Sequence, residues 1–234
     1  MNTERVYQNV SFASDYQIGE FAIIGIPPRG YQDGELATTF GERVEIKSHA
    51  VIYAGNHFGD DCVLGHSLYM RHNNQVGNRV QIGAISVLES NIRIKDDVYI
   101  APQAGIADYA ILEEGVWIGS QTMFASVLHP LCPKIKECEK GAHFYRASMV
   151  GSNVTIYPDL RIGEGAFVEP GSVVVRDVRP FMVVSGNPAQ EVGDIFTLYP
   201  GKLERLEQFL NLSSEAIALI RHQFESQTTL FPPR

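Results

Sequence analysis

Residues 76–118 read VGNRVQIGAISVLESNIRIKDDVYIAPQAGIADYAILEEGVWI, and every sixth residue of this stretch is apolar. The same frame runs without a break from Phe40 to Phe124. Its members are Phe40, Ile46, Ile52, Phe58, Leu64, Met70, Val76, Ile82, Leu88, Ile94, Ile100, Ile106, Leu112, Ile118 and Phe124. A fixed short period is typical of a solenoid, in which each unit buries its apolar face against the next. The repeat therefore decides the fold class before any single motif is considered.

The period of six predicts extended chain. Apolar residues of a helix recur every three or four positions, whereas alternate side chains of a strand face opposite sides, and six is a multiple of two. The fifth residue of each hexad is usually small or β-branched, and the residue after the frame position is often glycine. Two side chains per hexad thus point inward, and we expect the glycine to permit the corners between short strands.

More hexads flank the long run. A second run in a shifted frame comprises Val150, Ile156, Ile162, Val168 and Val174, and a fragment around Ile18 and Ile24 has the same signature. At three hexads to a triangular coil, about twenty-two hexads predict roughly seven coils, stacked ~4.8 Å apart. The predicted fold class is all-β, a parallel β-helix formed by a hexapeptide solenoid.

Loops that break the frame are where function is expected in a monotonous solenoid. One interruption lies at residues 125–149, which we expect to form a loop extruded from the β-helix. A second, shorter one lies between Ile24 and Phe40. After residue 192 the pattern changes, and residues 193–234 are expected to form a helical tail that caps the β-helix domain of residues 1–192. Leu203, Leu206 and Phe209 indicate one amphipathic helix; Ile217, Ile220 and Phe224 indicate another, with Ser213 or Ser214 as its N-cap.

Composition excludes several classes of protein. The net charge of −8 argues against nucleic acid or an anionic membrane as partner. No stretch reads as a signal peptide or reaches transmembrane length. Three cysteines in such a chain favour a reduced, cytoplasmic location, and Cys62 occupies an inward slot where we expect it to be core.

A terminal motif gives a resemblance to a known family. Residues 162–178 read IGEGAFVEPGSVVVRDV, and VSGNPA follows at residues 184–189. With the repeat, this motif resembles the hexapeptide-repeat acyltransferases over about residues 15–195, and it is similar to the sugar and sugar-nucleotide N-acetyltransferases. The resemblance implies a left-handed β-helix, a homotrimer, and acetyl-CoA bound between subunits with no metal. It implies N-acetylation of an amino sugar, nucleotide-linked, in surface polysaccharide or glycan biosynthesis. Galactoside and antibiotic O-acetyltransferases share the motif, so O-acetylation of a sugar or an antibiotic is the alternative.

Two histidines are candidates for the general base that removes a proton from the attacking amine or hydroxyl. His129-Pro130 opens the long loop, where galactoside-type and antibiotic-type relatives place their catalytic histidine. His66 is the second candidate, because Leu64-Gly65-His66-Ser67 resembles a Gly-His pattern of sugar-nucleotide members. Both residues are expected to face outward from the coils.

The terminal motif also supplies candidate residues for binding acetyl-CoA. Asn187 and Pro188 correspond to the point where the family's chain meets the nucleotide end of coenzyme A. Arg176 is a candidate contact for its phosphates. The remaining candidates are the small residues Gly163, Ala166 and Gly171, along which the pantetheine arm would lie.

Three other hypotheses stay open. His129, Cys132, Cys138 and His143 lie within fifteen residues and would suit a structural zinc site, or a Cys132–Cys138 disulfide in an oxidising compartment. A γ-carbonic-anhydrase-like enzyme shares this fold and would bind zinc through histidines such as His66. A β-helix without activity would serve as a scaffold.

Overall fold

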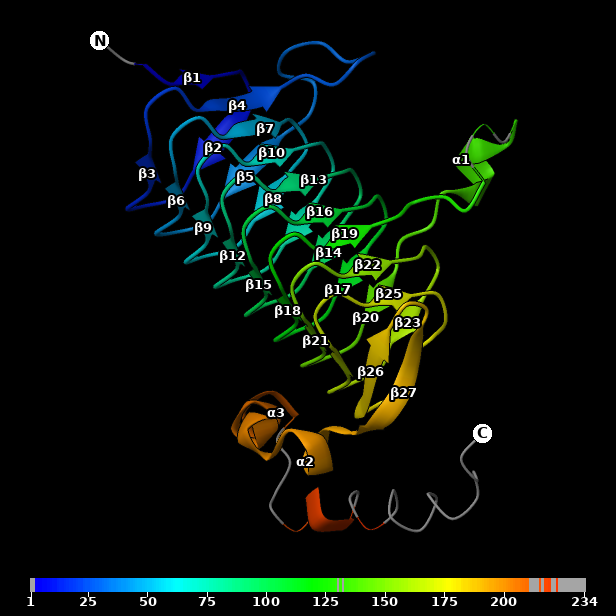
Figure 1. Ribbon diagram of the computed structural model, residues 1–234. Helices are drawn as coiled ribbons and strands as arrows, with labels where there is room; N and C mark the ends of the chain where they lie inside the picture. Colours follow the sequence, from blue (N-terminus) through cyan, green and yellow to red (C-terminus); the bar gives the residue numbers. More distant parts are fainter. Residues whose placement is uncertain are drawn as a thin grey trace.

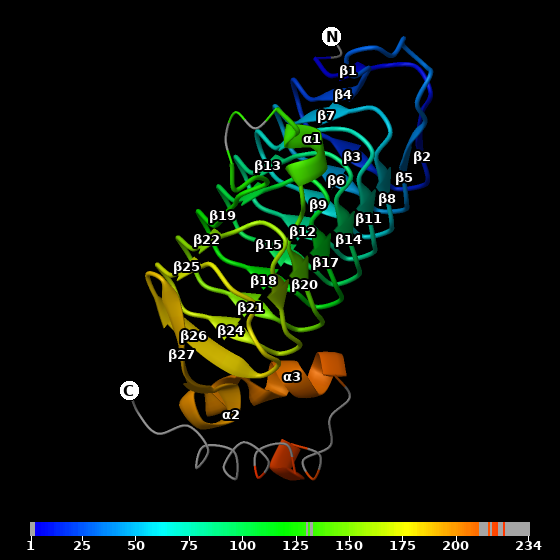
Figure 2. The same cartoon turned by 90° about the vertical axis from the view of Figure 1, so that its right-hand side faces the viewer.

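The computed structural model describes residues 3–129, 131, 133–210, 215, 217–219 and 222. These residues wind into a left-handed parallel β-helix with three sheets, shown in Figures 1 and 2. In each coil the chain passes through sheet A, then sheet B, then sheet C. Residues that pair between successive coils are eighteen apart in the uninterrupted part, as for Tyr69 and Val87. Three hexads therefore make one coil, as the repeat predicts.

The strands are short because each hexad supplies one strand and one corner. Sheet A comprises β1 (Arg5–Val6), β4 (Ile23–Ile26), β7 (Val51–Tyr53), β10 (Tyr69–Met70), β13 (Val87–Leu88), β16 (Gly105–Ile106), β19 (Met123–Phe124), β22 (Thr155–Ile156) and β25 (Val173–Val174). Sheet B comprises β2 (Val10–Phe12), β5 (Thr38–Phe40), β8 (His57–Phe58), β11 (Gln75–Val76), β14 (Arg93–Ile94), β17 (Ile111–Leu112), β20 (His143–Phe144) and β23 (Arg161–Ile162). Sheet C comprises β3 (Gln17–Ile18), β6 (Glu45–Ile46), β9 (Val63–Leu64), β12 (Gln81–Ile82), β15 (Tyr99–Ile100), β18 (Trp117–Ile118), β21 (Met149–Val150), β24 (Phe167–Val168), β26 (Met182–Gly186) and β27 (Ala189–Asp194).

The solenoid is longer than the seven coils that the hexad count predicts. Within the described residues sheet A has nine strands and sheet C has ten. The count omits four strands of the parallel part: β1 and β2 of the outermost coil, β20 at the end of the long interruption and β26 after Val174. The outermost coil packs on one neighbour only, so its sequence is under weaker constraint.

The glycines after the frame positions serve a different purpose from the one expected. The residue with a positive φ at a corner is usually the third after the frame position, as at Asn73 (62°) and Asp97 (60°). Gly83 is not among the residues with positive φ, but a Cβ on it would lie 2.3 Å from the backbone nitrogen of Pro102. These glycines therefore permit the close approach of successive coils, and the turn itself is made by Asn, Asp and other residues in the left-handed region.

The core is a column of frame residues that repeat at the coil spacing. Phe40 stacks on Phe58 with ring centroids 4.6 Å apart, and Phe124 stacks on Phe144 at 4.7 Å. Phe40 and Phe58 stack because equivalent residues on successive coils are held at the ~4.8 Å spacing of hydrogen-bonded strands. Phe124 in sheet A and Phe144 in sheet B are consecutive frame residues on adjacent sheets, and their rings meet inside the coil. All four rings are at most 7% exposed, so the apolar surface of each coil is covered by its neighbours.

Two buried asparagines interrupt the apolar core at the corner between sheets A and B. The Asn74 side chain donates to the carbonyl of Arg71 (2.9 Å) and accepts from the Ile92 amide (2.8 Å). Asn56 accepts from the Asn74 amide at 2.9 Å, so the two residues form a ladder along the coil axis. Both are fully buried, and their hydrogen bonds satisfy backbone groups that the turn leaves unpaired.

Replacing Asn74 with alanine is expected to lower the free energy of unfolding by about 1–3 kcal/mol, because the amide of Ile92 loses its buried acceptor. Urea denaturation of the variant and of Gln75→Ala, an exposed neighbour on the same coil, measures the difference. Equal midpoints for the two variants would show that the ladder adds nothing to stability.

Cys62 lies in the core, as its position in the repeat predicts, with 0% exposure. Burial raises the pKa of its thiol to about 11, because the interior disfavours the charged thiolate. In a Cys132→Ser/Cys138→Ser background, we expect the Cys62 thiol of the folded protein to resist alkylation by iodoacetamide at pH 8 and to react once urea unfolds the chain. Rapid labelling of the folded protein at pH 8, measured by mass spectrometry, would contradict this placement.

The C-terminal end of the β-helix is closed by a hairpin and short helices. Strand β27 pairs with β26 in an antiparallel manner, which extends sheet C beyond its parallel part. Helices α2 (Ile195–Leu198) and α3 (Leu203–Leu210), joined by a 3₁₀ turn (Pro200–Lys202), follow the hairpin. Asp194 caps α2 by accepting from the amide of Thr197 at 2.9 Å.

The helices pack on the outer surface of the last strands of sheet C. Their buried residues form a second apolar cluster with outward-facing residues of that sheet: Ala147, Met149, Phe167, Val183, Ile195, Phe196, Leu206, Phe209 and Ile217. Arg205 donates to the carbonyl of Gly115 at 2.5 Å, which ties α3 to the body. A C-terminal helical cap is therefore present, as predicted. Ser213, Ser214, Ile220 and Phe224 of the second predicted helix lie outside the described residues. In the described part of the chain, no helix has the length and apolar character needed to span a bilayer.

Candidate active site

Both interruptions of the repeat leave the β-helix at the same corner. We name the corners by the sheets they join: A–B, B–C and C–A. The first loop connects β4 to β5, and Ile23 pairs with Val51, twenty-eight residues on instead of eighteen. The second connects β19 to β20, and Met123 pairs with Thr155, thirty-two residues on. Each loop thus runs from sheet A to sheet B, and Figure 1 shows the two projecting from the same side of the body.

The second loop is shorter than the interval that the sequence predicts. It ends at Ala142, because β20 already lies in sheet B, where His143 pairs with Ile111 and Arg161. Phe144 is fully buried and precedes Val150 by six residues, so it belongs to the second hexad run. The extruded loop, residues 125–142, contains the helix α1 (Ile135–Cys138), and the Lys140 amide donates to the Ser126 carbonyl at its base (3.1 Å).

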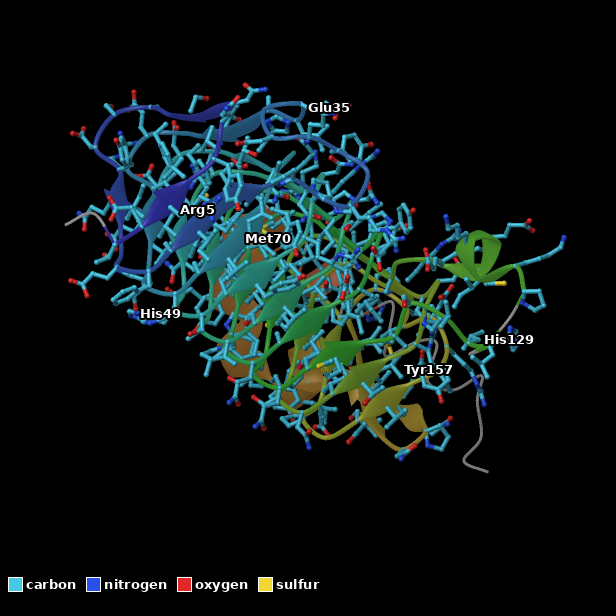
Figure 3. The ribbon with its side chains drawn as sticks, turned by 90° about the horizontal axis from the view of Figure 1, so that it is seen from above. Arg5, Glu35, His49, Met70, His129 and Tyr157 are labelled. Atoms are coloured by element: carbon cyan, nitrogen blue, oxygen red, sulfur yellow. The ribbon has the colours of Figure 1, made fainter. Side chains whose placement is uncertain are left out.

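His129 is an exposed residue of the extruded loop. Figure 3 shows it beyond the edge of the β-helix, away from the coils of its own chain. The position suits a base that acts on a substrate held outside the body of the chain. The pairing of β20 within sheet B sets the end of the loop, and the side chain of His129 stays accessible.

His66 lies at another corner. It follows β9 at the C–A corner and is exposed, and its Nδ1 shares a hydrogen bond with the hydroxyl of Ser48 at 2.8 Å. His49, the neighbour of Ser48, lies at the same corner and is labelled in Figure 3. It lies on the opposite side of the body from His129. The structure therefore does not bring His66 and His129 of one chain together.

The candidate residues for coenzyme A fall into an exposed and a buried group. Arg176 follows β25, the last strand of sheet A. It is exposed at the A–B corner, from which the loop that carries His129 also emerges. Asn187 and Pro188 are exposed in the turn between β26 and β27, where the Gly186 amide donates to the hydroxyl of Ser172 at 3.1 Å. These three residues are available to a ligand outside the β-helix.

The three small candidate residues also differ in exposure: one is exposed and two are buried. Gly171 is exposed at the C–A corner with φ 74°, and a Cβ added there would meet nothing within 4 Å. Ala166 is fully buried and faces the core, so its side chain is not available to a ligand outside the coils. Gly163 is also buried, and a Cβ there would lie 2.4 Å from the backbone nitrogen of Pro180. The structure explains Gly163 by coil packing alone.

Sequence reasoning missed a carboxylate–imidazole pair on sheet B. Nε2 of His143 lies 2.6 Å from a carboxylate oxygen of Glu113, and the imidazole stacks on Tyr145 with centroids 4.1 Å apart. The pair lines a cavity of about 430 Å³ together with Lys95 and Arg146. The sequence gives no sign of it, because the extruded loop separates the two residues by thirty positions and only the coil pairing brings them together.

The described residues contain no cluster of side chains that would support the two metal-site hypotheses. No group of three or more His, Cys, Asp or Glu side chains there is arranged to hold a metal ion. Cys132 lies outside the described residues, and His143 is bonded to Glu113. His66 and His72, six residues apart, lie at the C–A and A–B corners respectively, so one chain does not present them to a common ion.

Comparison with known proteins finds acetyltransferases that are similar to parts of this chain. No family model matches the chain. A chloramphenicol acetyltransferase of Klebsiella aerogenes is 40% identical over 48 residues, which are 20% of this chain and 23% of that protein. Serine acetyltransferase 2 of Arabidopsis thaliana is 33% identical over 111 residues, which are 44% of this chain and 34% of that protein. The chain thus matches between about a quarter and a third of the length of these relatives.

The solved structures agree on the fold. A UDP-N-acetylglucosamine acyltransferase from Campylobacter jejuni superposes with a TM-score of 0.67 at 17% identity, over 98% of this chain and 86% of that one. The hexad repeat, the left-handed β-helix and the named relatives together support a resemblance to the hexapeptide-repeat acyltransferases. This agrees with the resemblance that the terminal motif and the repeat predict.

Proposed function

We propose that the protein transfers an acetyl group from acetyl-CoA to the amine of a nucleotide-linked amino sugar, in the synthesis of a surface polysaccharide or other glycan. The observation that carries the proposal is the extruded loop at the A–B corner, which presents His129 to solvent from an otherwise regular β-helix. The names of the sequence relatives, which are acetyltransferases, support acetyl-CoA as donor.

The proposed mechanism needs few groups. His129 removes the proton of the acceptor amine as its nitrogen attacks the thioester carbonyl of acetyl-CoA. The tetrahedral intermediate then collapses, the carbon–sulfur bond breaks, and coenzyme A leaves as the thiol when it takes up a proton. His129 can return that proton as the imidazolium, so the residue ends the cycle unchanged. An imidazole can act as base in its neutral form and as acid in its protonated form, which suits it to both steps.

The donor would lie toward the C-terminal end of the β-helix. Arg176, Asn187 and Pro188 are exposed there, and the guanidinium of Arg176 would bind phosphate groups of coenzyme A. Gly171 offers an exposed surface without a side chain, along which the pantetheine arm would pass. We also propose a homotrimer, because His129 projects away from its own coils and a second chain would complete the site.

Release of free coenzyme A thiol tests the proposal. The purified protein is incubated with acetyl-CoA and a panel of acceptors: UDP-linked amino sugars, simple amino sugars, and hydroxyl acceptors that include galactosides and chloramphenicol. Acceptor-dependent thiol release with an amino-sugar nucleotide, and a product heavier by one acetyl group, is the expected result. Release with the hydroxyl acceptors alone would replace N-acetylation by O-acetylation, and no release with any acceptor would contradict the function.

A further inference from the structure

A cavity with its own chemistry lies at the A–B corner, between the two loops. Its volume is about 300 Å³. Its lining consists of Pro28 and Arg29 of the first loop and the corner residues Tyr53, Tyr69, Arg71, His72 and Glu89. Neither the terminal motif nor the proposed base accounts for these residues.

Two aromatic rings form one wall of the cavity. Tyr53 and Tyr69 lie edge to face, with ring centroids 5.7 Å apart. The neighbouring side chain of Tyr53 is the main reason why the pKa of Tyr69 lies above its ordinary value. Tyr69 leaves 36% of its surface exposed at the cavity. Exposed tyrosine rings provide an apolar face for the C–H surface of a sugar or for a nucleotide base.

Charged groups form the rest of the lining. Arg71 donates to a carboxylate oxygen of Glu89 at 2.8 Å, so these two charges balance each other. Arg29 is exposed at the cavity, and no ion pair joins it to a carboxylate of the described residues. The cavity thus carries a surplus positive charge in a protein whose net charge is −8. A surplus guanidinium beside aromatic rings favours an anionic, ring-containing ligand.

The imidazole of His72 completes the lining and is held in place. Its Nδ1 lies 3.2 Å from the hydroxyl of Ser90, and the Ser90 amide donates to Asp108 at 3.1 Å. Partial burial, followed by repulsion from Arg71, holds the pKa of His72 below its ordinary value. This shift favours the uncharged imidazole, so the arginines and Glu89 are the main charges of the cavity.

The cavity lies within reach of the proposed reaction site. Glu89 follows β13 and Ala125 follows β19 at the same A–B corner, which is two coils on, or roughly 10 Å along the axis. A single sugar ring does not span this separation, whereas a sugar with a linked phosphate and a further group does. The two ends of such a substrate would occupy the cavity and the region of the extruded loop.

We propose that this cavity is the subsite for the phosphate-bearing part of a sugar-phosphate acceptor, with Arg29 contacting the phosphate and the two tyrosines contacting the adjoining ring. The subsite rests on the proposed function only for its role in acetyl transfer. Binding itself does not need turnover. The donor would then approach from the C-terminal coils and the acceptor from the N-terminal coils.

The test measures the binding of small probes to the full chain in the absence of acetyl-CoA. Saturation-transfer NMR and calorimetry are the two methods. The probes are N-acetylglucosamine 1-phosphate, N-acetylglucosamine, UDP-N-acetylglucosamine and inorganic phosphate. We expect the sugar phosphates to bind saturably, and Arg29→Ala to weaken their binding about tenfold or more while leaving that of the neutral sugar unchanged. Tyr69→Ala should weaken all three sugar probes, and Tyr69→Phe should keep most of the binding.

A control away from the cavity is Arg79→Ala, which should leave the binding of the probes unchanged. Arg79 is an exposed arginine at the B–C corner, paired with Asp97 of the next coil as Arg71 is paired with Glu89. Equal affinities in wild type and Arg29→Ala, no saturable binding of any sugar phosphate, or equal affinity for inorganic phosphate would overturn the subsite. Binding that depends on Arg29 in a protein that never releases coenzyme A thiol would keep the subsite and contradict the proposed function.

Discussion

Replacing His129 with alanine is expected to lower kcat for acetyl transfer by a factor of about 10²–10⁴, the range that a positioned general base contributes. The variant should bind acetyl-CoA as the wild type does, because His129 lies on the extruded loop and the proposed donor residues lie on the terminal coil and hairpin. Steady-state kinetics by thiol release, with calorimetric titration of acetyl-CoA, measures the two effects separately.

The chain offers matched histidines for this experiment. His49→Ala removes an exposed histidine at the C–A corner, whose ring contacts Phe21, and should leave kcat unchanged. His66→Ala removes the second candidate base, which is bonded to Ser48. A large loss in His66→Ala with normal activity in His129→Ala would reverse the assignment of the base. A large loss in Glu113→Gln and His143→Gln alone would move it to the pair on sheet B.

Replacing Phe144 with alanine is expected to lower the free energy of unfolding by about 3–5 kcal/mol. The ring is fully buried, and it stacks on Phe124 across the point where the loop interrupts the repeat. The large cost follows because neighbouring coils are held by their hydrogen bonds and cannot collapse into the cavity. Urea denaturation provides the measurement.

Phe21→Ala is the control for this second prediction, since Phe21 is 51% exposed and should cost much less. A loss below about 1 kcal/mol in Phe144→Ala would mean that the apolar column does not continue across the loop. Such a result would also imply that the extruded loop ends after Phe144 and not at Ala142.

The sequence predicts the β-helix because the physical constraint is local and repeated. Each frame residue must fill the same space one coil above its predecessor, so the pattern survives in single residues from Phe40 to Phe124. The antiparallel strand β27 does not follow this pattern, since its pairing is set by a hairpin and not by the repeat.

The sequence alone is sufficient to predict that the two loops leave the β-helix at the same corner. Fourteen hexads separate Phe40 from Phe124, and because three hexads make a coil, this count places both interruptions after a strand of the same sheet. The Glu113–His143 pair and the cavity at the A–B corner cannot be predicted in this way. They depend on contacts between coils, and the number of residues extruded from a loop shifts which residues meet.

Calorimetric titration of acetyl-CoA into the purified protein tests the central claim most directly. The account predicts saturable binding with a stoichiometry near one site per chain, and weaker binding in Arg176→Ala because a phosphate contact is lost. An absence of binding at millimolar acetyl-CoA, in protein that circular dichroism shows to be folded, would contradict the assignment of this β-helix as an acetyl-CoA-dependent transferase.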